Sequence, residues 1–170
     1  MTIACMLEDA GSTERLGEVV ARLLLPRDVV LLVGDLGAGK TTLVRGLVRG
    51  LGGTDKVTSP TFTLRHEYAT TPALTHVDCW RLAEPDELDD LGLDEVIADG
   101  GALVIEWGEF ADFRFGESAL HLSLSDAGGG ESRLARLDLS PAAWSLRSDR
   151  LLVELERAGL VAAVDETASS

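Results

Sequence analysis

The chain has 170 residues, a mass of 18.1 kDa and a formal net charge of −14 at pH 7. A chain of this length forms one domain and can bury roughly 70% of its unfolded surface, so it needs no disulfide framework. The excess of acids argues against unaided binding along a nucleic-acid backbone, because clustered Lys and Arg make the phosphate contacts.

The first third of the chain predicts two strands, each followed by a helix. Residues 2–7 are typical of a short strand. From Ser12, a plausible N-cap, apolar residues recur at helical spacing until Pro26 ends the helix. The apolar run at residues 29–33 predicts a buried strand, and residues 40–51 predict an amphipathic helix with its apolar face in the core.

The middle of the chain predicts three more strands and a short helix. Residues 61–68 and 73–78 are rich in β-forming residues, and a breaker separates them. A short acidic helix is expected to begin near Pro85. The apolar run at residues 102–107 is typical of a buried strand.

The last third predicts a hairpin and a helix. Apolar and polar residues alternate over residues 120–125 and again over residues 134–139, with a glycine-rich turn between them. Residues 141–163 are expected to be mostly helical. We expect a single domain over residues 1–164 and a disordered tail over residues 165–170.

Residues 34–42 fit the phosphate-binding pattern G-x-x-x-x-G-K-[ST] and lie between a predicted strand and a predicted helix, as that motif requires. Glycines with positive φ let backbone N–H groups point at a phosphate, and the helix adds its partial positive end. Lys40 would reach the β and γ phosphates, and the Thr41 hydroxyl would contact Mg²⁺. The expected nucleotide-binding residues are Asp35, Leu36, Gly37, Ala38, Gly39, Lys40, Thr41 and Thr42.

The chain contains no asparagine and no glutamine. A guanine-reading Asn-Lys-x-Asp motif is therefore excluded, and so is the glutamine that orients water in GTPases. ATP is favoured over GTP as the nucleotide. The group that orients water must then be Asp, Glu, Ser, Thr or His, or must come from a partner protein.

Two acids close predicted strands and are candidate catalytic residues together with Lys40. Asp78 ends one apolar strand and Glu106 ends another, which is the edge where α/β sheets place their sites. A buried acid is costly unless it is paired or bound to metal. The alternative is that each carboxylate caps a neighbouring helix or pairs with Arg81.

Other polar and aromatic residues carry weaker signals. The hydroxyls of Thr58-Ser59-Pro60-Thr61 could sense the γ phosphate, although a simple turn before a strand is the alternative. His76 shares a strand face with Asp78, but a lone histidine is more often a satisfied polar residue than a catalyst. Trp107 could form a stacking or docking surface, or could belong to the core.

The cysteines and the hydropathy of the chain indicate the cellular compartment in which the protein is expected. Cys5 and Cys79 lack metal-ligand spacing and suit buried packing in a reducing environment. No apolar run approaches the roughly 20 residues that span a bilayer, and the first residues do not resemble a signal peptide. We expect a cytoplasmic protein with no membrane partner.

Four segments, residues 34–42, 58–64, 76–82 and 104–107, resemble in sequence, order and spacing the bacterial TsaE family, formerly YjeE. That family is the ATPase subunit of the machinery that makes threonylcarbamoyladenosine in tRNA. The resemblance runs from about residue 9 to residue 107. One departure is Trp80, where the family usually has Tyr, so any hydrogen bond from that hydroxyl is lost.

The resemblance implies an α/β P-loop NTPase fold, with a mixed, mainly parallel central sheet flanked by helices and the C-terminal hairpin and helix. It implies ATP and Mg²⁺ as cofactors, the TsaD and TsaB transferase proteins as partners, and only indirect contact with tRNA. Thr41 and Glu106 would serve the metal, and Asp78 would take a Walker-B-like place. Residues 58–61, namely Thr58, Ser59, Pro60 and Thr61, would form the switch, with Trp107 near the nucleotide or the partner.

Two other functions remain as alternatives. A small-molecule kinase usually needs a mobile lid that carries arginine, and the only candidate, Arg133-Leu134-Ala135-Arg136, is better interpreted as a strand. A non-catalytic module gated by nucleotide would bind ATP without releasing phosphate.

Overall fold

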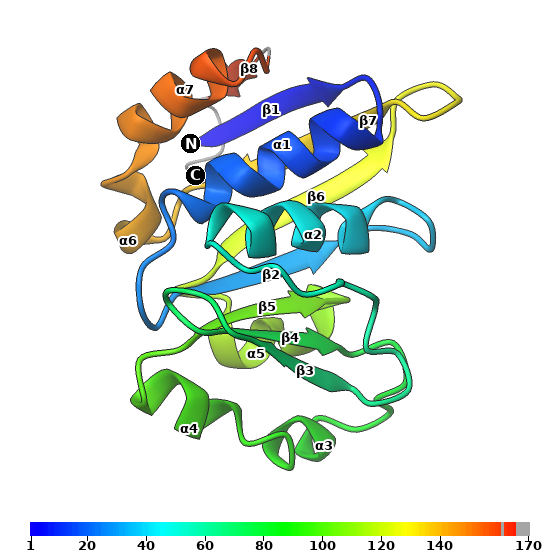
Figure 1. The fold of residues 1–170 in the computed structure, drawn as a ribbon, viewed down its shortest axis with the longest axis vertical. Helices are drawn as coiled ribbons and strands as arrows, with labels where there is room; N and C mark the ends of the chain where they lie inside the picture. Colours follow the sequence, from blue (N-terminus) through cyan, green and yellow to red (C-terminus); the bar gives the residue numbers. More distant parts are fainter. Residues whose placement is uncertain (161, 166–170) are drawn as a thin grey trace.

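The computed structural model describes residues 1–160 and 162–165. Eight strands of this part form one sheet in the order β3-β4-β5-β2-β6-β7-β1-β8 (Figure 1). The strands are β1 (Thr2–Leu7), β2 (Val29–Val33), β3 (Arg65–Tyr68), β4 (Leu74–Asp78), β5 (Ala102–Glu106), β6 (Leu120–Asp126), β7 (Arg133–Asp138) and β8 (Ala162–Asp165).

The centre of the sheet is parallel. Strand β2 pairs in parallel with β5 and β6, and β5 pairs in parallel with β4. Antiparallel strands extend this core on both sides, with β3 beyond β4 and β7, β1 and β8 beyond β6. Strands β4 and β5 are buried along their whole length, as expected for strands inside a parallel sheet with both faces covered. The predicted mixed sheet with a parallel core and the predicted hairpin of β6 and β7 are confirmed.

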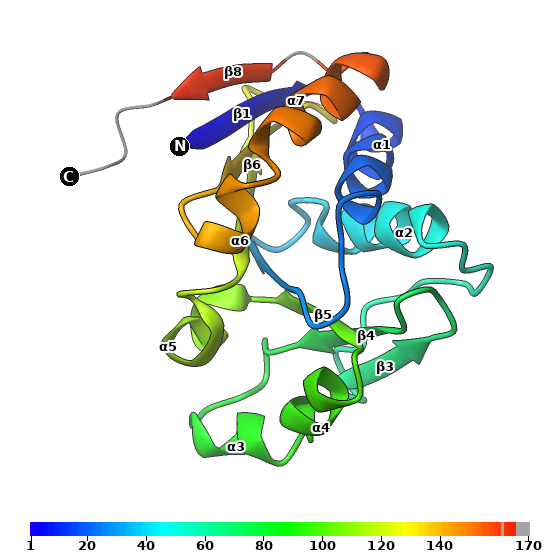
Figure 2. The same cartoon turned by 90° about the vertical axis from the view of Figure 1, so that its left-hand side faces the viewer.

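Helices cover both faces of the sheet. They are α1 (Ala10–Ala21), α2 (Lys40–Gly50), α3 (Asp86–Asp89), α4 (Leu93–Ala98), the 3₁₀ helix η1 (Gly108–Ala111), α5 (Asp112–Phe115), α6 (Ala142–Ser145) and α7 (Ser148–Arg157). Along β2, Val30 and Leu32 join the core under α1, α2 and α7, whereas Val29 and Leu31 join the core under α3, α4 and α5. Figure 2 shows α1 and α2 on one side of the sheet and α5 on the other. None of the described helices could cross a bilayer.

The prediction that Ser12 caps the first helix is wrong, because Asp9 is the N-cap. The Asp9 carboxylate accepts a hydrogen bond from the Ser12 backbone N–H at 2.7 Å, and the Ser12 hydroxyl oxygen accepts one from the Asp9 N–H at 3.0 Å. This is a capping box in which serine replaces the usual Glu or Gln at the third position. The helix ends at Ala21, several residues before Pro26.

Residues in the left-handed conformation shorten two of the predicted strands. Residues 61–64 form a turn, because Leu64 takes a left-handed φ of 63° and its N–H bonds the Pro60 carbonyl at 2.6 Å. Strand β3 therefore begins only at Arg65. Strand β5 ends at Glu106, because Trp107 also takes a left-handed conformation, with φ of 58°.

The C-terminal segment contains a strand that the helical prediction missed. After α6 and α7, β8 pairs with β1 in antiparallel register from Ala162 opposite Cys5 to Asp165 opposite Thr2. Four residues carry too little periodicity to indicate a strand, and their pairing with the first strand is a non-local contact. Asp165 belongs to this strand, and the rest of the expected tail, residues 166–170, lies outside the described residues.

Helices α1 and α2 pack closely through two glycines. A Cβ placed on Gly17 would overlap the Leu43 carbonyl oxygen, and one placed on Gly46 would overlap the Glu14 carbonyl oxygen. Backbone atoms cannot rotate away as side chains do. The close contact therefore fixes α2, and with it Lys40 at its first turn, against α1.

We expect Gly46→Ala to destabilise the protein, because overpacking typically costs about 1–3 kcal/mol and exceeds the helix-propensity gain of up to about 1 kcal/mol. The free energy of unfolding in urea measures this change. Gly11→Ala is the matched control, because its added Cβ would meet its nearest neighbour, an Asp9 carboxylate oxygen, at an ordinary 3.4 Å. Equal stability of the two variants would contradict the close approach of the helices.

Candidate nucleotide site

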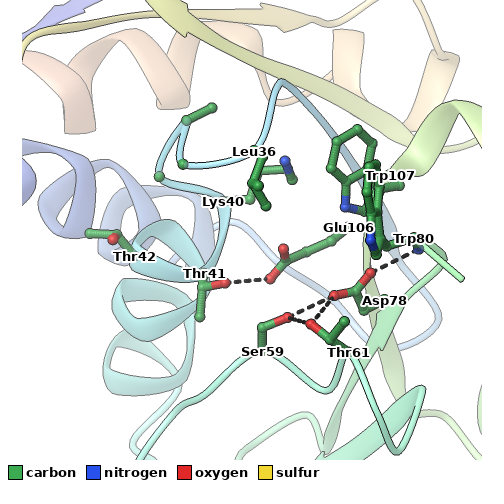
Figure 3. A pocket seen from close by; sticks show the side chains of 13 residues that line it. Leu36, Lys40, Thr41, Thr42, Ser59, Thr61, Asp78, Trp80, Glu106 and Trp107 are labelled. Carbon is green, nitrogen blue, oxygen red and sulfur yellow. Dashed lines mark hydrogen bonds between the residues drawn. The ribbon is translucent and has the colours of Figure 1, made fainter.

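A cavity of about 320 Å³ lies beyond the carboxyl ends of β2, β4 and β5 (Figure 3). It is lined by residues 36–42 of the glycine-rich loop and by both strand-end acids. Ser59, Thr61 and Trp107 also line it, so the structure brings most of the predicted site together. The cavity lining does not include Asp35, Thr58 or Pro60.

The loop after β2 contains glycines in backbone conformations that other residues rarely adopt. Gly37 and Gly39 take positive φ of 78° and 101°, and Gly39 is the N-cap of α2. An added Cβ on Gly37 would meet nothing within 4 Å, so the space beside the loop is open to a ligand. Gly34 is needed for another reason, because a Cβ there would lie 2.5 Å from the Leu124 carbonyl oxygen of β6.

Lys40 begins α2 and is only 5% exposed. Its ammonium group donates hydrogen bonds to the carbonyl oxygens of Gly34 and of Asp35, the latter at 2.9 Å. Burial lowers the pKa of Lys40, and nearby carboxylates, Glu106 foremost, oppose this shift. The lysine is thus a cation held at the cavity by carbonyl groups that a phosphate could replace as its partners.

The ring of Trp107 contacts the ammonium group of Lys40. The Lys40 nitrogen lies 4.0 Å from the ring centroid, which is a cation–π contact. The left-handed φ of Trp107 is uncommon for a bulky residue, and such strain clusters at functional sites. Trp80, which is 53% exposed, stacks obliquely on Trp107 with ring centroids 4.4 Å apart.

We expect magnesium and ATP to change the fluorescence of Trp107, because Lys40 must leave the ring to reach the β and γ phosphates. Fluorescence titration of the purified protein measures the change. Trp107→Phe should abolish most of the signal, whereas Trp144→Phe should retain it, because Trp144 is fully buried in the α1 and α2 core. A full signal in Trp107→Phe would contradict this movement of Lys40.

The two strand-end acids are neighbours in the sheet. Asp78 of β4 lies opposite Glu106 of β5, and they are 2% and 4% exposed. Glu106 Oε1 accepts a hydrogen bond from the Thr41 hydroxyl at 2.9 Å and also lies 2.8 Å from Nε2 of His76. The carboxylate thus reaches the first turn of α2, where the sequence predicts a hydroxyl that contacts magnesium.

Asp78 is held by the predicted switch segment. Its Oδ2 accepts hydrogen bonds from the Ser59 hydroxyl at 2.7 Å and the Thr61 hydroxyl at 2.9 Å, and its Oδ1 accepts one from the Trp80 N–H at 2.9 Å. The alternative pairing of Asp78 with Arg81 is wrong, because the Arg81 guanidinium lies over the Phe62 ring, 4.4 Å from its centroid. The segment before β3 is a turn, and two of its hydroxyls bond a cavity acid.

Arg133 is a residue that sequence reasoning did not place at the loop. From the start of β7 it donates hydrogen bonds to the Ala38 carbonyl at 3.2 Å and the Gly37 carbonyl at 3.3 Å. It also lines a second hollow beside the loop, together with Ala10 and Thr13 of α1. The partners are about 95 residues apart in sequence, so only the position of β7 in the sheet reveals the contact.

The oxygen atoms of Thr41 and Glu106 suit Mg²⁺, which prefers hard oxygen ligands. In residues 1–160 and 162–165, no group of three or more His, Cys, Asp or Glu side chains could hold a metal ion by itself. This fits Mg²⁺ in nucleotide sites, where one or two protein groups and the substrate phosphates share the ion.

Both cysteines are buried, as expected for packing residues. Burial raises the pKa of the Cys5 thiol to about 11 and that of the Cys79 thiol to about 12. Both therefore stay protonated at neutral pH, and neither can act as a nucleophile there.

The site and its fold match a known family. The family model "Threonylcarbamoyl adenosine biosynthesis protein TsaE" matches residues 7–134. The chain belongs to the TsaE family. This match confirms the resemblance seen in the four motifs and extends it past them, through β6 and into the first two residues of β7, where Arg133 lies.

Members of the TsaE family align with most of the chain. A protein of Treponema pallidum named "tRNA threonylcarbamoyladenosine biosynthesis protein TsaE" is 43% identical over 120 residues, covering 71% of this chain and 89% of its own length. The protein of the same name from Streptomyces coelicolor is 45% identical over 118 residues, covering 67% and 79%. The crystal structure of Bacillus subtilis YdiB superposes with a TM-score of 0.72 at 28% identity, covering 94% of this chain and 97% of that one.

Proposed function

We propose that this TsaE chain binds and hydrolyses ATP with Mg²⁺ in the cytoplasm, as the subunit that drives threonylcarbamoyladenosine modification of tRNA by the TsaD and TsaB transferase proteins. The observation that carries the proposal is the hydrogen bond from Thr41 to Glu106, which joins the glycine-rich loop to the buried acids. The names of the relatives support the pathway.

Each group at the cavity has a proposed role. The loop N–H groups and Lys40 bind the phosphates and stabilise the negative charge of the transition state. Thr41 and Glu106 hold Mg²⁺, which neutralises charge on the phosphate oxygens. Asp78 links the phosphate side of the site to Ser59 and Thr61, so loss of the γ phosphate can loosen the switch segment.

We expect hydrolysis by the isolated protein to be slow. The chain lacks the glutamine that orients water in GTPases, and its catalysis rests on electrostatic stabilisation. A partner can supply the missing orientation of water. The net charge of −14 supports contact with tRNA through the partners and not through the surface of this chain.

The structure weakens the kinase alternative. A kinase lid needs a mobile arginine, whereas Arg133 and Arg136 belong to β7, which is paired on both sides within the sheet. The remaining alternative, a nucleotide-gated binding module, has no separate structural support and differs from the proposal only in phosphate release.

Association with the transferase pair, followed by a phosphate-release assay, tests the proposed function. Purified protein should bind TsaD and TsaB more strongly with ATP than without, and phosphate release should require Mg²⁺ and be faster with all the proteins present than with this protein alone. No association under either condition would contradict the proposed partners. ATP binding without phosphate release in the full mixture would favour the binding module instead.

A further inference from the structure

His76 lies next to the proposed magnesium site but is remote from solvent. It is the third residue of β4, is 0% exposed, and lies opposite Val104 of β5 on one side and His66 of β3 on the other. Its Nε2 atom is 2.8 Å from Oε1 of Glu106. This hydrogen bond to Glu106 gives the buried imidazole a role besides packing in the core.

The direction of this hydrogen bond follows from the groups involved. An ionised carboxylate can only accept, so Nε2 of His76 carries the proton and donates. Among the described residues, Nδ1 of His76 has no hydrogen-bond partner. The tautomer with the proton on Nε2 therefore leaves a lone pair at Nδ1, which costs less than a buried N–H without an acceptor.

The same oxygen of Glu106 receives a second hydrogen bond. The Thr41 hydroxyl donates to Oε1 at 2.9 Å, so two donors from two elements hold this atom. Among the described residues, no hydrogen bond reaches Oε2. In Figure 3 this second oxygen points away from Thr41, within the cavity that Glu106 lines. The two hydrogen bonds thereby fix the Glu106 carboxylate at Oε1 and leave Oε2 facing the cavity.

We propose that His76 is a positioning residue for the magnesium-side carboxylate of Glu106. Its Nε2 proton holds Oε1 so that Oε2 faces the cavity with its charge free for the metal. This inference rests on the proposed function, since it assumes magnesium beside the nucleotide. ATP binding without metal is not expected to depend on His76, because His76 does not line the cavity.

A merely structural role for His76 makes a different prediction. Its ring stacks on that of Tyr68 with centroids 6.2 Å apart, so a change at His76 can alter the stability of β3 and β4. Such a role would move the unfolding midpoint but would leave the effect of magnesium on ATP affinity unchanged.

The test compares two variants that differ in reach. In His76→Gln, the amide nitrogen can stand near the original Nε2 and donate to Glu106, whereas the shorter side chain of His76→Asn cannot reach. Both variants bury one amide, which keeps their folding comparable. His66→Asn is the control, because it changes an exposed histidine at the paired position of β3. Calorimetry measures ATP affinity of each protein with Mg²⁺ and with EDTA.

We expect the gain in ATP affinity on adding Mg²⁺ to fall by about 10- to 100-fold in His76→Asn, as for other partners of metal ligands. His76→Gln should keep most of the gain, and His66→Asn should keep all of it. An unchanged gain in His76→Asn, or an equal loss in both His76 variants, overturns this inference and leaves the proposed function standing. Wild-type protein that binds no ATP contradicts the proposed function itself and the inference with it.

Discussion

The Lys40→Ala variant is expected to lose ATP binding. Lys40 is a buried cation at the first turn of α2, and its ammonium group is the phosphate partner that the motif supplies. Hydrogen bonds from a charged group contribute about 1.5–3 kcal/mol each, so two lost bonds to phosphate weaken affinity by about 100-fold or more. Calorimetry with magnesium and ATP measures this loss.

Lys56→Ala is the matched control for this prediction, because Lys56 is the only other lysine of the chain and is exposed. It should bind ATP as the wild type does. Urea unfolding of Lys40→Ala should show a folded protein, since the change removes a desolvated charge and not an apolar contact. An affinity of Lys40→Ala within about tenfold of wild type would remove the lysine from the phosphate site.

The Glu106→Gln variant is expected to retain ATP binding in EDTA but to lose magnesium-dependent hydrolysis. Glutamine keeps the shape of the side chain and removes its charge. Phosphate release with the partners present should fall by about 100-fold or more, since even the outer partners of metal ligands contribute about 10- to 100-fold. The ratio of phosphate-release rates, with ATP affinity in EDTA measured beside it, separates metal binding from nucleotide binding.

Glu117→Gln controls for the loss of one negative charge, because Glu117 is exposed and does not line the cavity. It should hydrolyse ATP at the wild-type rate. Unchanged phosphate release in Glu106→Gln would exclude this carboxylate from the metal site. A Glu106→Gln protein that also failed to bind ATP in EDTA would mean that the carboxylate shapes the loop itself.

Much of the fold could be predicted because its signals are local. The apolar run of β2, the amphipathic face of α2 and the alternation in β6 and β7 each occupy one stretch of sequence. The wrong N-cap has a local cause too. Asp9 and Ser12 are both good caps, and the reciprocal bonds that choose Asp9 form only once the helix exists.

Strand β8 and the break at Leu64 could not be predicted from local sequence patterns. A four-residue edge strand is stabilised by its pairing with β1, at the other end of the chain. The turn at residues 61–64 depends in part on Asp78, which accepts the hydroxyl hydrogen bonds of Ser59 and Thr61. Neither partner is visible in the local pattern of residues.

The sequence by itself determined the phosphate loop, its lysine and hydroxyl, and two acids at strand ends, because motif spacing and periodicity are properties of neighbouring residues. Only the tertiary structure decided that Thr41 bonds Glu106, that His76 holds the same carboxylate oxygen, and that Arg133 bonds the loop. These contacts depend on strand order and register. Backbone pairing and core packing across the whole chain set both, so no single stretch of sequence encodes them.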